Sequence, residues 1–277
     1  TSILIAVVFA SMAYSMEVGG NMGKGARNMW GYSTMMFTGQ WGLFIVLGLF
    51  LFAPLFDTPN WFGMMLPVGF TGGFGTAAAV GGALEGVGAD AASSLGFTSA
   101  TVGTLAAIIG GVIAGNWGIR KGKVSHVPKE LPEELRRGYI KNIDERPSLG
   151  RATTNPSSIE PLALHFGFII LTVMTAYGIN QGLSSIWENV SVPLFAMSMV
   201  VGLLFRAVMN FVGAEDYLDK DSISSISGAA TDYLIAFGVA AIVPAAIASY
   251  WQALLLLFVL GTIFCVFFLL WFPAEFF

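Results

Sequence analysis

The residues with the clearest chemical potential are Gly72, Gly73 and Gly75, which fall within four residues of an apolar stretch and are followed by Thr76. Each glycine lowers helix propensity by ~1 kcal/mol relative to alanine. Thr76 is a good N-cap, and the alanines at 77–79 are good helix formers. We therefore expect an unwound glycine turn and then a short helix that begins near Thr76. The free N–H groups at that helix start would suit a carboxylate, although close helix packing also selects small residues.

Phe74 and three hydroxyl residues are further candidates near this turn. Phe74 lies between the glycines, where it would either contact a substrate or act as a packing wedge. Thr98, Ser99 and Thr101 fall where we expect the next helix to begin. Their hydroxyls, together with Thr76 and exposed carbonyls, could bind sodium, a hard cation that prefers oxygen ligands. Alternatively, one of them caps the helix and the others have no such role.

Three polar residues fall inside long apolar runs. Arg206 and Asn210 are four residues apart, so they share one helix face. Arg206 could pair with a substrate carboxylate, or extend to the membrane surface. Asp232 lies near the middle of the apolar run 223–243, where a carboxylate costs ~3 kcal/mol on insertion scales. A bound sodium would compensate that charge; a protonated Asp232 bonded to a neighbouring helix, or one paired with Arg206, would do so too.

The chain shows no pattern typical of an enzyme. Its two histidines and one cysteine have no metal-ligand spacing. We interpret Cys265 as an inert packing residue and His165 as an interfacial or packed one. No P-loop is present, which argues against ATP as the energy source. No basic face with interleaved aromatics indicates a nucleic-acid partner.

The composition places these residues in a lipid bilayer. Hydrophobic residues make up 55% of the 277 positions and charged residues only 11%, where a soluble domain would carry roughly a quarter charged. A hydrocarbon core of ~30 Å needs about 20 apolar residues in a helix. We therefore predict an all-α polytopic membrane protein with Pro244 dividing its last long apolar run. The expected spans are 2–16, 30–56, 100–117, 161–183, 192–212, 223–243 and 246–272, with a glycine-interrupted segment at 61–84.

Basic residues set the expected orientation. The loop 118–158 holds nine of the chain's 13 lysine and arginine residues, so we place it in the cytoplasm. Lys24 and Arg27 place the loop 17–28 on the same side. The span 30–56 then ends outside, and 100–117 must return to the cytoplasm. The segment between them cannot simply cross, so we predict a glycine-rich re-entrant hairpin at 61–97, with its tip at 72–75.

Two stretches carry a resemblance to a known family: GGFGTAAAVG at 72–81 and GFTSATVG at 96–103. With the basic loop after them, they resemble the bacterial sodium:glutamate symporters, and the likeness extends to VGLLFRAVMN and SGAATDYLIAFG. Phe74 departs from the pattern, since some members have histidine or another residue there. The resemblance implies an inverted-repeat secondary transporter. Residues 1–117 would be the end of its first repeat, 118–160 the cytoplasmic central loop, and 161–277 the start of its second repeat.

The same resemblance implies a function. It predicts sodium-coupled symport of glutamate by a homodimer in the bacterial cytoplasmic membrane, through elevator-like alternating access. Sodium would be the coupling ion, with no organic cofactor. A symporter for another carboxylate or amino acid, an ion channel with a glycine-rich filter, and a structural membrane subunit are the alternatives. A structural subunit would need neither a broken helix nor buried charges.

Overall fold

The computed structural model describes residues 2–16, 23–121, 140, 146–186 and 192–271, and every regular element in these ranges is helical. Most of the predicted central loop and part of the loop 17–28 lie outside the described residues. The elements, in chain order, are α1 (Ser2–Ser15), α2 (Lys24–Leu47), η1 (Gly48–Phe52), α3 (Ala53–Phe56), η2 (Phe62–Met64), α4 (Met65–Phe70), α5 (Gly73–Glu85), α6 (Ala92–Arg120), α8 (Pro161–Ile186), α9 (Leu194–Val212), η4 (Glu215–Tyr217), α10 (Lys220–Ala240) and α11 (Pro244–Trp271).

Six of these helical segments in the described part of the chain are long and apolar enough to cross a membrane. They are 25–56, where α2, η1 and α3 run on as one helix, and then α6, α8, α9, α10 and α11. The prediction of a polytopic α-helical membrane protein is thus confirmed. α1 coincides with the first expected span but has only 14 residues. Pro244 separates α10 from α11 as predicted, because proline fits the first turn of a helix but not its interior.

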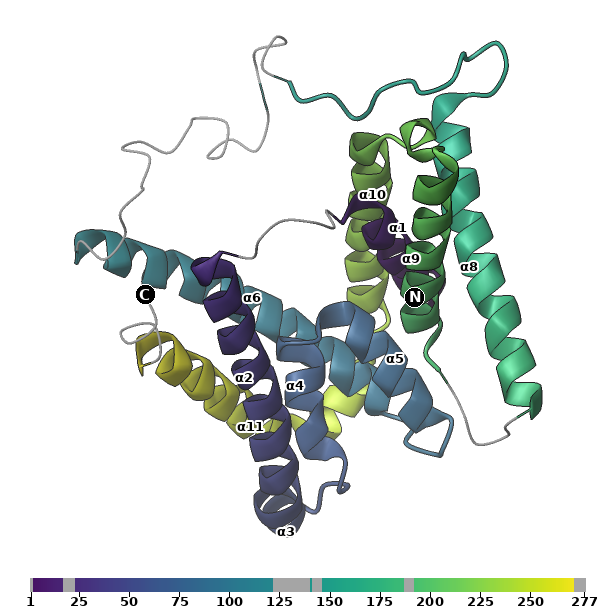
Figure 1. The fold of residues 1–277 in the computed structure, drawn as a ribbon. Coiled ribbons are helices and arrows are strands. Elements are labelled where there is room, and N and C mark those ends of the chain that lie inside the picture. Colours follow the sequence, from purple (N-terminus) through teal and green to yellow (C-terminus); the bar gives the residue numbers. More distant parts are fainter. Residues whose placement is uncertain (1, 17–22, 122–139, 141–145, 187–191, 272–277) are drawn as a thin grey trace.

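The helices form two neighbouring groups (Figure 1). In one group, α1 packs against α8, α9 and α10. In the other, the short helices α4 and α5 lie against α6, beside α2 and α11. The largest apolar core belongs to this second group and is rich in buried aromatic side chains, including Phe44, Phe52 and Phe62. This arrangement embeds the glycine stretch in protein on several sides.

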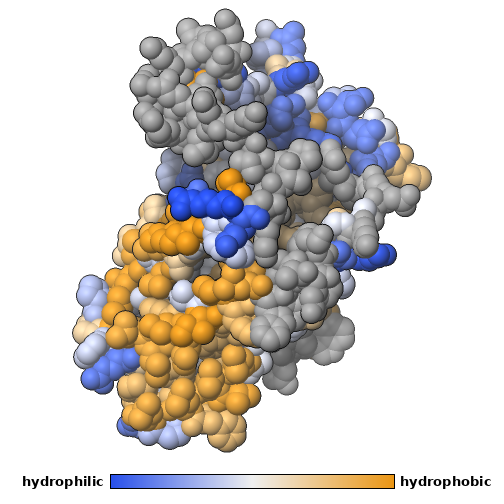
Figure 2. All heavy atoms as spheres, turned by 90° about the vertical axis from the view of Figure 1, so that its left-hand side faces the viewer, coloured by the Kyte–Doolittle hydropathy of each residue, from blue (hydrophilic) through white to orange (hydrophobic). Residues whose placement is uncertain are grey.

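The outer face of the second group is strongly apolar (Figure 2). On α6, Ile108, Ile109 and Val112 are exposed, each by about 60% of its surface. Phe50 on η1 and Ile263 on α11 are exposed as well. An apolar face of this kind suits contact with lipid tails and not with water.

Candidate functional site

The predicted break in the glycine stretch is confirmed. α4 ends at Phe70, and Thr71 and Gly72 donate their backbone N–H groups to the carbonyl of Pro67, over 3.3 and 3.0 Å. These bonds close the end of α4. Gly73 then adopts a φ of +67°, a left-handed conformation that only glycine takes without strain. The chain changes direction at this point and re-enters a helix at once.

One detail of that prediction was wrong, because Thr76 does not cap the second helix. α5 begins at Gly73, three residues earlier, and its N-cap is Gly72, which has no side chain to form a capping bond. The hydroxyl of Thr76 donates instead to the carbonyl of Gly72, 3.0 Å away. The left-handed Gly73 turns the backbone directly into the helix, so α5 starts without a capping side chain. The first N–H groups of α5 thus receive no side-chain oxygen from the cap position.

The broken segment packs closely on α6 through small residues. A Cβ on Gly69 would overlap Ser99 and the backbone nitrogen of Ala100, and a Cβ on Gly103 would be 3.0 Å from Phe70. On the other side of the break, Gly96 lies against Ala77. The stretches 72–81 and 96–103 are therefore parts of one packed unit, and the break itself crosses the first half of α6.

The hydroxyl residues of α6 do not open that helix, contrary to the prediction. α6 begins at Ala92, where the Glu85 carboxylate accepts the backbone N–H of Ser93 over 3.1 Å. Thr98 and Thr101 are buried or half-buried inside the helix and donate to carbonyls four residues earlier. The fully buried Ser99 donates to the Leu66 carbonyl of α4, 3.4 Å away. At about 100° per residue, Ser99 and Thr101 point to nearly opposite sides of α6, so the structure does not bring them to one point.

Gly75 and Phe74 both contact the other helix group. A Cβ on Gly75 would overlap the Cδ1 of Ile5 on α1. Phe74 is 7% exposed, and its ring is 6.4 Å from that of Phe97, nearly parallel to it. It also fills the space beside Gly238 of α10. These contacts favour the packing wedge for Phe74 over a substrate contact.

The structure places Arg206 and Asn210 away from the glycine break. The Arg206 guanidinium donates to the carbonyls of Ala13 and Met16 at the end of α1. Asn210, with its amide nitrogen turned toward the nearby acceptors, donates to the Glu215 carboxylate over 3.3 Å. Ala13 lies about 12 Å further along α1 than Ile5, the residue that meets Gly75. Arg206 therefore anchors the far end of α1 and does not converge with the break.

Asp232 is exposed on the surface of α10. Within the described ranges it forms no hydrogen bond or ion pair, and the Arg206 guanidinium is directed at α1 instead. Neither the pairing with Arg206 nor a bond to a neighbouring helix is present. His165, by contrast, is a packed residue: it is fully buried and accepts the backbone N–H of Asp219 over 2.7 Å.

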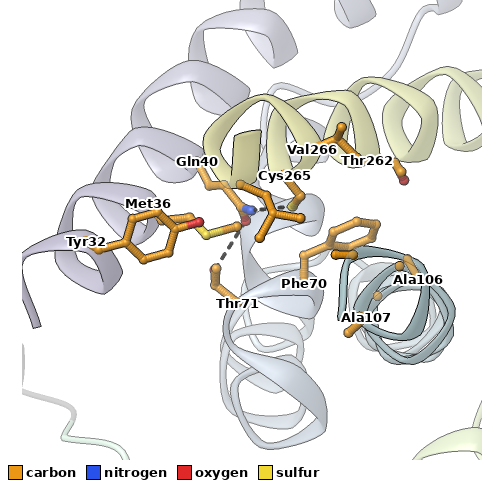
Figure 3. A pocket seen from close by; sticks show the side chains of 15 residues that line it. Tyr32, Met36, Gln40, Phe70, Thr71, Ala106, Ala107, Thr262, Cys265 and Val266 are labelled. Carbon is orange, nitrogen blue, oxygen red and sulfur yellow. Dashed lines mark hydrogen bonds between the residues drawn. The ribbon is translucent and has the colours of Figure 1, made fainter. Parts of the chain in front are cut away.

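Sequence reasoning missed a polar group beside the break. Gln40 of α2 is fully buried, and its amide contacts the Thr71 hydroxyl at 3.4 Å and the Cys265 thiol at 3.3 Å (Figure 3). These residues line a cavity of about 290 Å³ between α2, α4, α6 and α11. Gln40 is the single amide side chain in the span 30–56, and this was the available signal, since polar residues within a membrane are costly to bury. Cys265 is therefore a hydrogen-bonding contact of Gln40 as well as a packing residue.

The described residues contain no group of three or more histidine, cysteine, aspartate or glutamate side chains arranged to hold a metal ion. A sodium ion bound in this part of the chain would be held mainly by hydroxyl and carbonyl oxygens. Thr76 and Thr101 present such oxygens, because each has already given its hydroxyl hydrogen to a backbone carbonyl.

Comparison with known protein families gave one result that bears on this geometry. The model of a family described as sodium/glutamate symporter matches residues 44–273, a range that includes both the broken segment and α6. Comparisons with curated proteins and with solved structures found no match.

Proposed function

The chain belongs to the sodium/glutamate symporter family, and on that premise we propose that it carries glutamate, or a closely related acidic solute, together with sodium across a bacterial cytoplasmic membrane. The multi-pass helical fold is the one that such transport requires. Family membership makes the chain a symporter. The substrate, the membrane and the residues at the site are the parts that we propose.

The observation that carries the proposal is the left-handed break at Gly73. No described atom lies within 4 Å of a Cβ built on Gly73, so this side of the turn is open. A substrate carboxylate could approach the backbone here and accept N–H groups from the first turn of α5. The positive end of the helix dipole favours its charge. We therefore assign substrate binding to Gly72, Gly73, Gly75 and Thr76, centred on Gly73.

We propose that sodium binds close to the same turn. Thr76 stands in the first turn of α5, and Thr101 belongs to the α6 segment over which the break lies. Asp232 would supply a carboxylate if α10 moves toward the break during transport. The geometry gives Ser99 a weaker claim, because its hydroxyl is directed at α4. For Arg206 and Asn210 the observed bonds favour a structural role at the end of α1.

We further propose that transport involves relative movement of the two helix groups within a homodimer. The contacts of Gly75 with Ile5 and of Phe74 with Gly238 lie at the interface of the groups. Both contacts join a side chain to a glycine. Glycine lets the neighbouring helices approach closely at these points, and small sliding of packed helices is a known mode of domain movement.

Uptake of labelled glutamate by proteoliposomes tests the proposed function. The full-length protein should accumulate glutamate only when sodium is higher outside than inside, and uptake should saturate with both solutes. Dissipating the sodium gradient should abolish accumulation. Ion currents that pass without saturable glutamate uptake would identify a channel and overturn the proposal.

A further inference from the structure

The cavity that contains Gln40 runs away from the glycine break between three long helices. Its inner end is formed by Phe70 and Thr71, directly before the break. α2 and α11 contribute larger side chains to the walls, among them Tyr32, Met36 and Cys265 (Figure 3). α6 contributes small residues that keep the space open: Gly103, Ala106, Ala107, Gly110, Gly111 and Ala114.

Gln40 has hydrogen-bonding capacity that the described residues around it do not use. A glutamine amide offers two N–H donors and an oxygen with two lone pairs. The Thr71 hydroxyl has a single hydrogen, and its shorter bond, 2.8 Å, is to the Pro67 carbonyl. The 3.4 Å contact between Thr71 and the amide oxygen of Gln40 is then a weak one. The other amide contact is with a thiol sulfur, a poor acceptor.

A fully buried amide so poorly satisfied is costly to the fold. With the oxygen and nitrogen of the amide exchanged, the nitrogen would donate to the Thr71 hydroxyl oxygen and the oxygen would accept from the Cys265 thiol. One N–H and one lone pair would still lack a partner among the described residues. The unused groups belong to a side chain that lines the cavity. A ligand that brings both an acceptor and a donor would satisfy them.

Two described arginines lie beyond the outer end of the cavity. Tyr32 and Ala114 mark that end on α2 and α6. Arg27 lies about 7.5 Å before Tyr32 along α2, and Arg120 lies about 9 Å beyond Ala114 along α6. Both arginines are exposed. An anion would be attracted to this mouth.

We propose that this cavity is a second binding site for the transported acidic amino acid, between the glycine break and the membrane face where α2 begins and α6 ends. The inference rests on the proposed function and adds a stage to it. The amide of Gln40 donates to the solute carboxylate and accepts from its ammonium group. Binding here is weak, because one neutral side chain replaces the solute's water, and weak binding suits a site that the solute must leave.

Cys265 provides a direct probe, since it lines the cavity and is the single cysteine of the sequence. In the full-length protein, reconstituted with Cys265 as its only thiol, N-ethylmaleimide should modify this residue. Saturating glutamate in the presence of sodium should slow the modification several-fold. In Gln40→Met, which keeps the length of the side chain, glutamate should no longer protect Cys265, and the glutamate concentration for half-maximal uptake should rise several-fold.

Two further variants complete the test. Gln252→Met replaces an exposed glutamine on α11 and should leave both uptake and protection as in the wild type. Ala107→Leu narrows the cavity without touching the Gln40 amide, so it should slow both uptake and the modification of Cys265. It also provides an independent measurement if Gln40→Met does not fold.

The outcomes separate this inference from the proposed function. Sodium-driven glutamate uptake with no protection of Cys265 would overturn the second site and leave the function intact. Equal protection by a short-chain detergent, unaffected by Gln40→Met, would assign the cavity to an acyl chain and also overturn it. Absence of sodium-driven uptake in the wild type would overturn the proposed function and, with it, the role of this cavity in transport.

Discussion

Gly75 and Ile5 touch across the interface between the two helix groups, because a Cβ on Gly75 would overlap the Cδ1 of Ile5. Ile5 is only 4% exposed, so it has little room to withdraw. This contact joins the segment after the glycine break to α1. A displacement of one helix group against the other therefore changes the contact between Gly75 and Ile5.

We predict that Gly75→Val abolishes uptake while membrane insertion stays near the wild-type level. A β-branched side chain here would displace Ile5 and shift the first turn of α5. Gly82 belongs to the same helix, and no described atom lies within 4 Å of a Cβ built on it, so Gly82→Val is the matched control. Uptake assays on variants of equal expression provide the comparison. Near-normal uptake by Gly75→Val would refute the prediction.

The double variant Gly75→Val with Ile5→Ala separates two explanations of such a loss. If the defect is packing against α1, removing the Ile5 side chain should restore part of the uptake, and the two substitutions will not be additive. If the defect is a blocked approach of substrate to the backbone, the double variant will stay inactive. Both measurements need only the uptake assay.

The position of the break could be predicted because its cause is local. Three glycines in four residues disfavour a helix whatever surrounds them, and the left-handed Gly73 lies among them. The start of α6 could not be predicted in the same way. It is fixed by the Glu85 carboxylate at Ser93, so the hydroxyls of Thr98 and Ser99 lie inside the helix and do not cap it.

The cavity beside the break depends on contacts that no local pattern reveals. Gln40 meets Thr71, 31 residues away, and Cys265, 225 residues away. Only the tertiary fold brings these three together. Likewise, the i, i+4 spacing of Arg206 and Asn210 correctly predicted a shared helix face, but the carbonyls of α1 that Arg206 meets come from the opposite end of the sequence.

We predict that the tip of the break is reached from outside in the outward-facing state, as the distribution of basic loop residues indicates. Gly73→Cys in a Cys265→Ser background tests this, because its side chain would point into open space. The left-handed φ makes the variant less stable by about 1–2 kcal/mol, which most proteins tolerate. A membrane-impermeant thiol reagent should label it from the outside. Labelling only from the cytoplasmic face, under conditions that favour either state, would contradict the hairpin orientation.

A third prediction concerns the pH dependence of stability. Asp219, just before α10, accepts bonds from the N–H groups of Arg151 and Ser222 and from the Ser222 hydroxyl, each 2.9 to 3.0 Å long. Partial burial favours the protonated acid, but these bonds outweigh it and hold the pKa of Asp219 below its usual range. The stabilisation is therefore present above the unfolded-state pKa of about 4 and is lost as pH falls through the lower folded-state pKa.

Asp219→Ala should accordingly lower the unfolding temperature at pH 7 and have less effect in acid. Loss of this N-cap alone should cost ~1 kcal/mol. Thermal unfolding of the purified protein, followed from about pH 7 down to below the unfolded-state pKa of about 4, measures the difference. Asp216→Ala removes an exposed carboxylate nearby and should show no such trend. An Asp219→Ala effect that stays constant across this range would contradict the linkage.

The last prediction concerns Asp232. Its carboxylate is exposed on α10 and meets no partner among the described residues, although a charge near the middle of a span costs ~3 kcal/mol. Sodium would offset that cost, and α10 already contacts α5 and α6, which carry Thr76 and Thr101. We therefore expect Asp232→Asn to raise the sodium concentration for half-maximal uptake several-fold while folding and assembly stay unchanged. Asp221→Asn, an exposed carboxylate at the start of α10, should leave it unaltered. If Asp232→Asn keeps the wild-type sodium dependence, Asp232 is structural, and the proposed sodium site depends on the hydroxyls of Thr76, Ser99 and Thr101 and on backbone carbonyls.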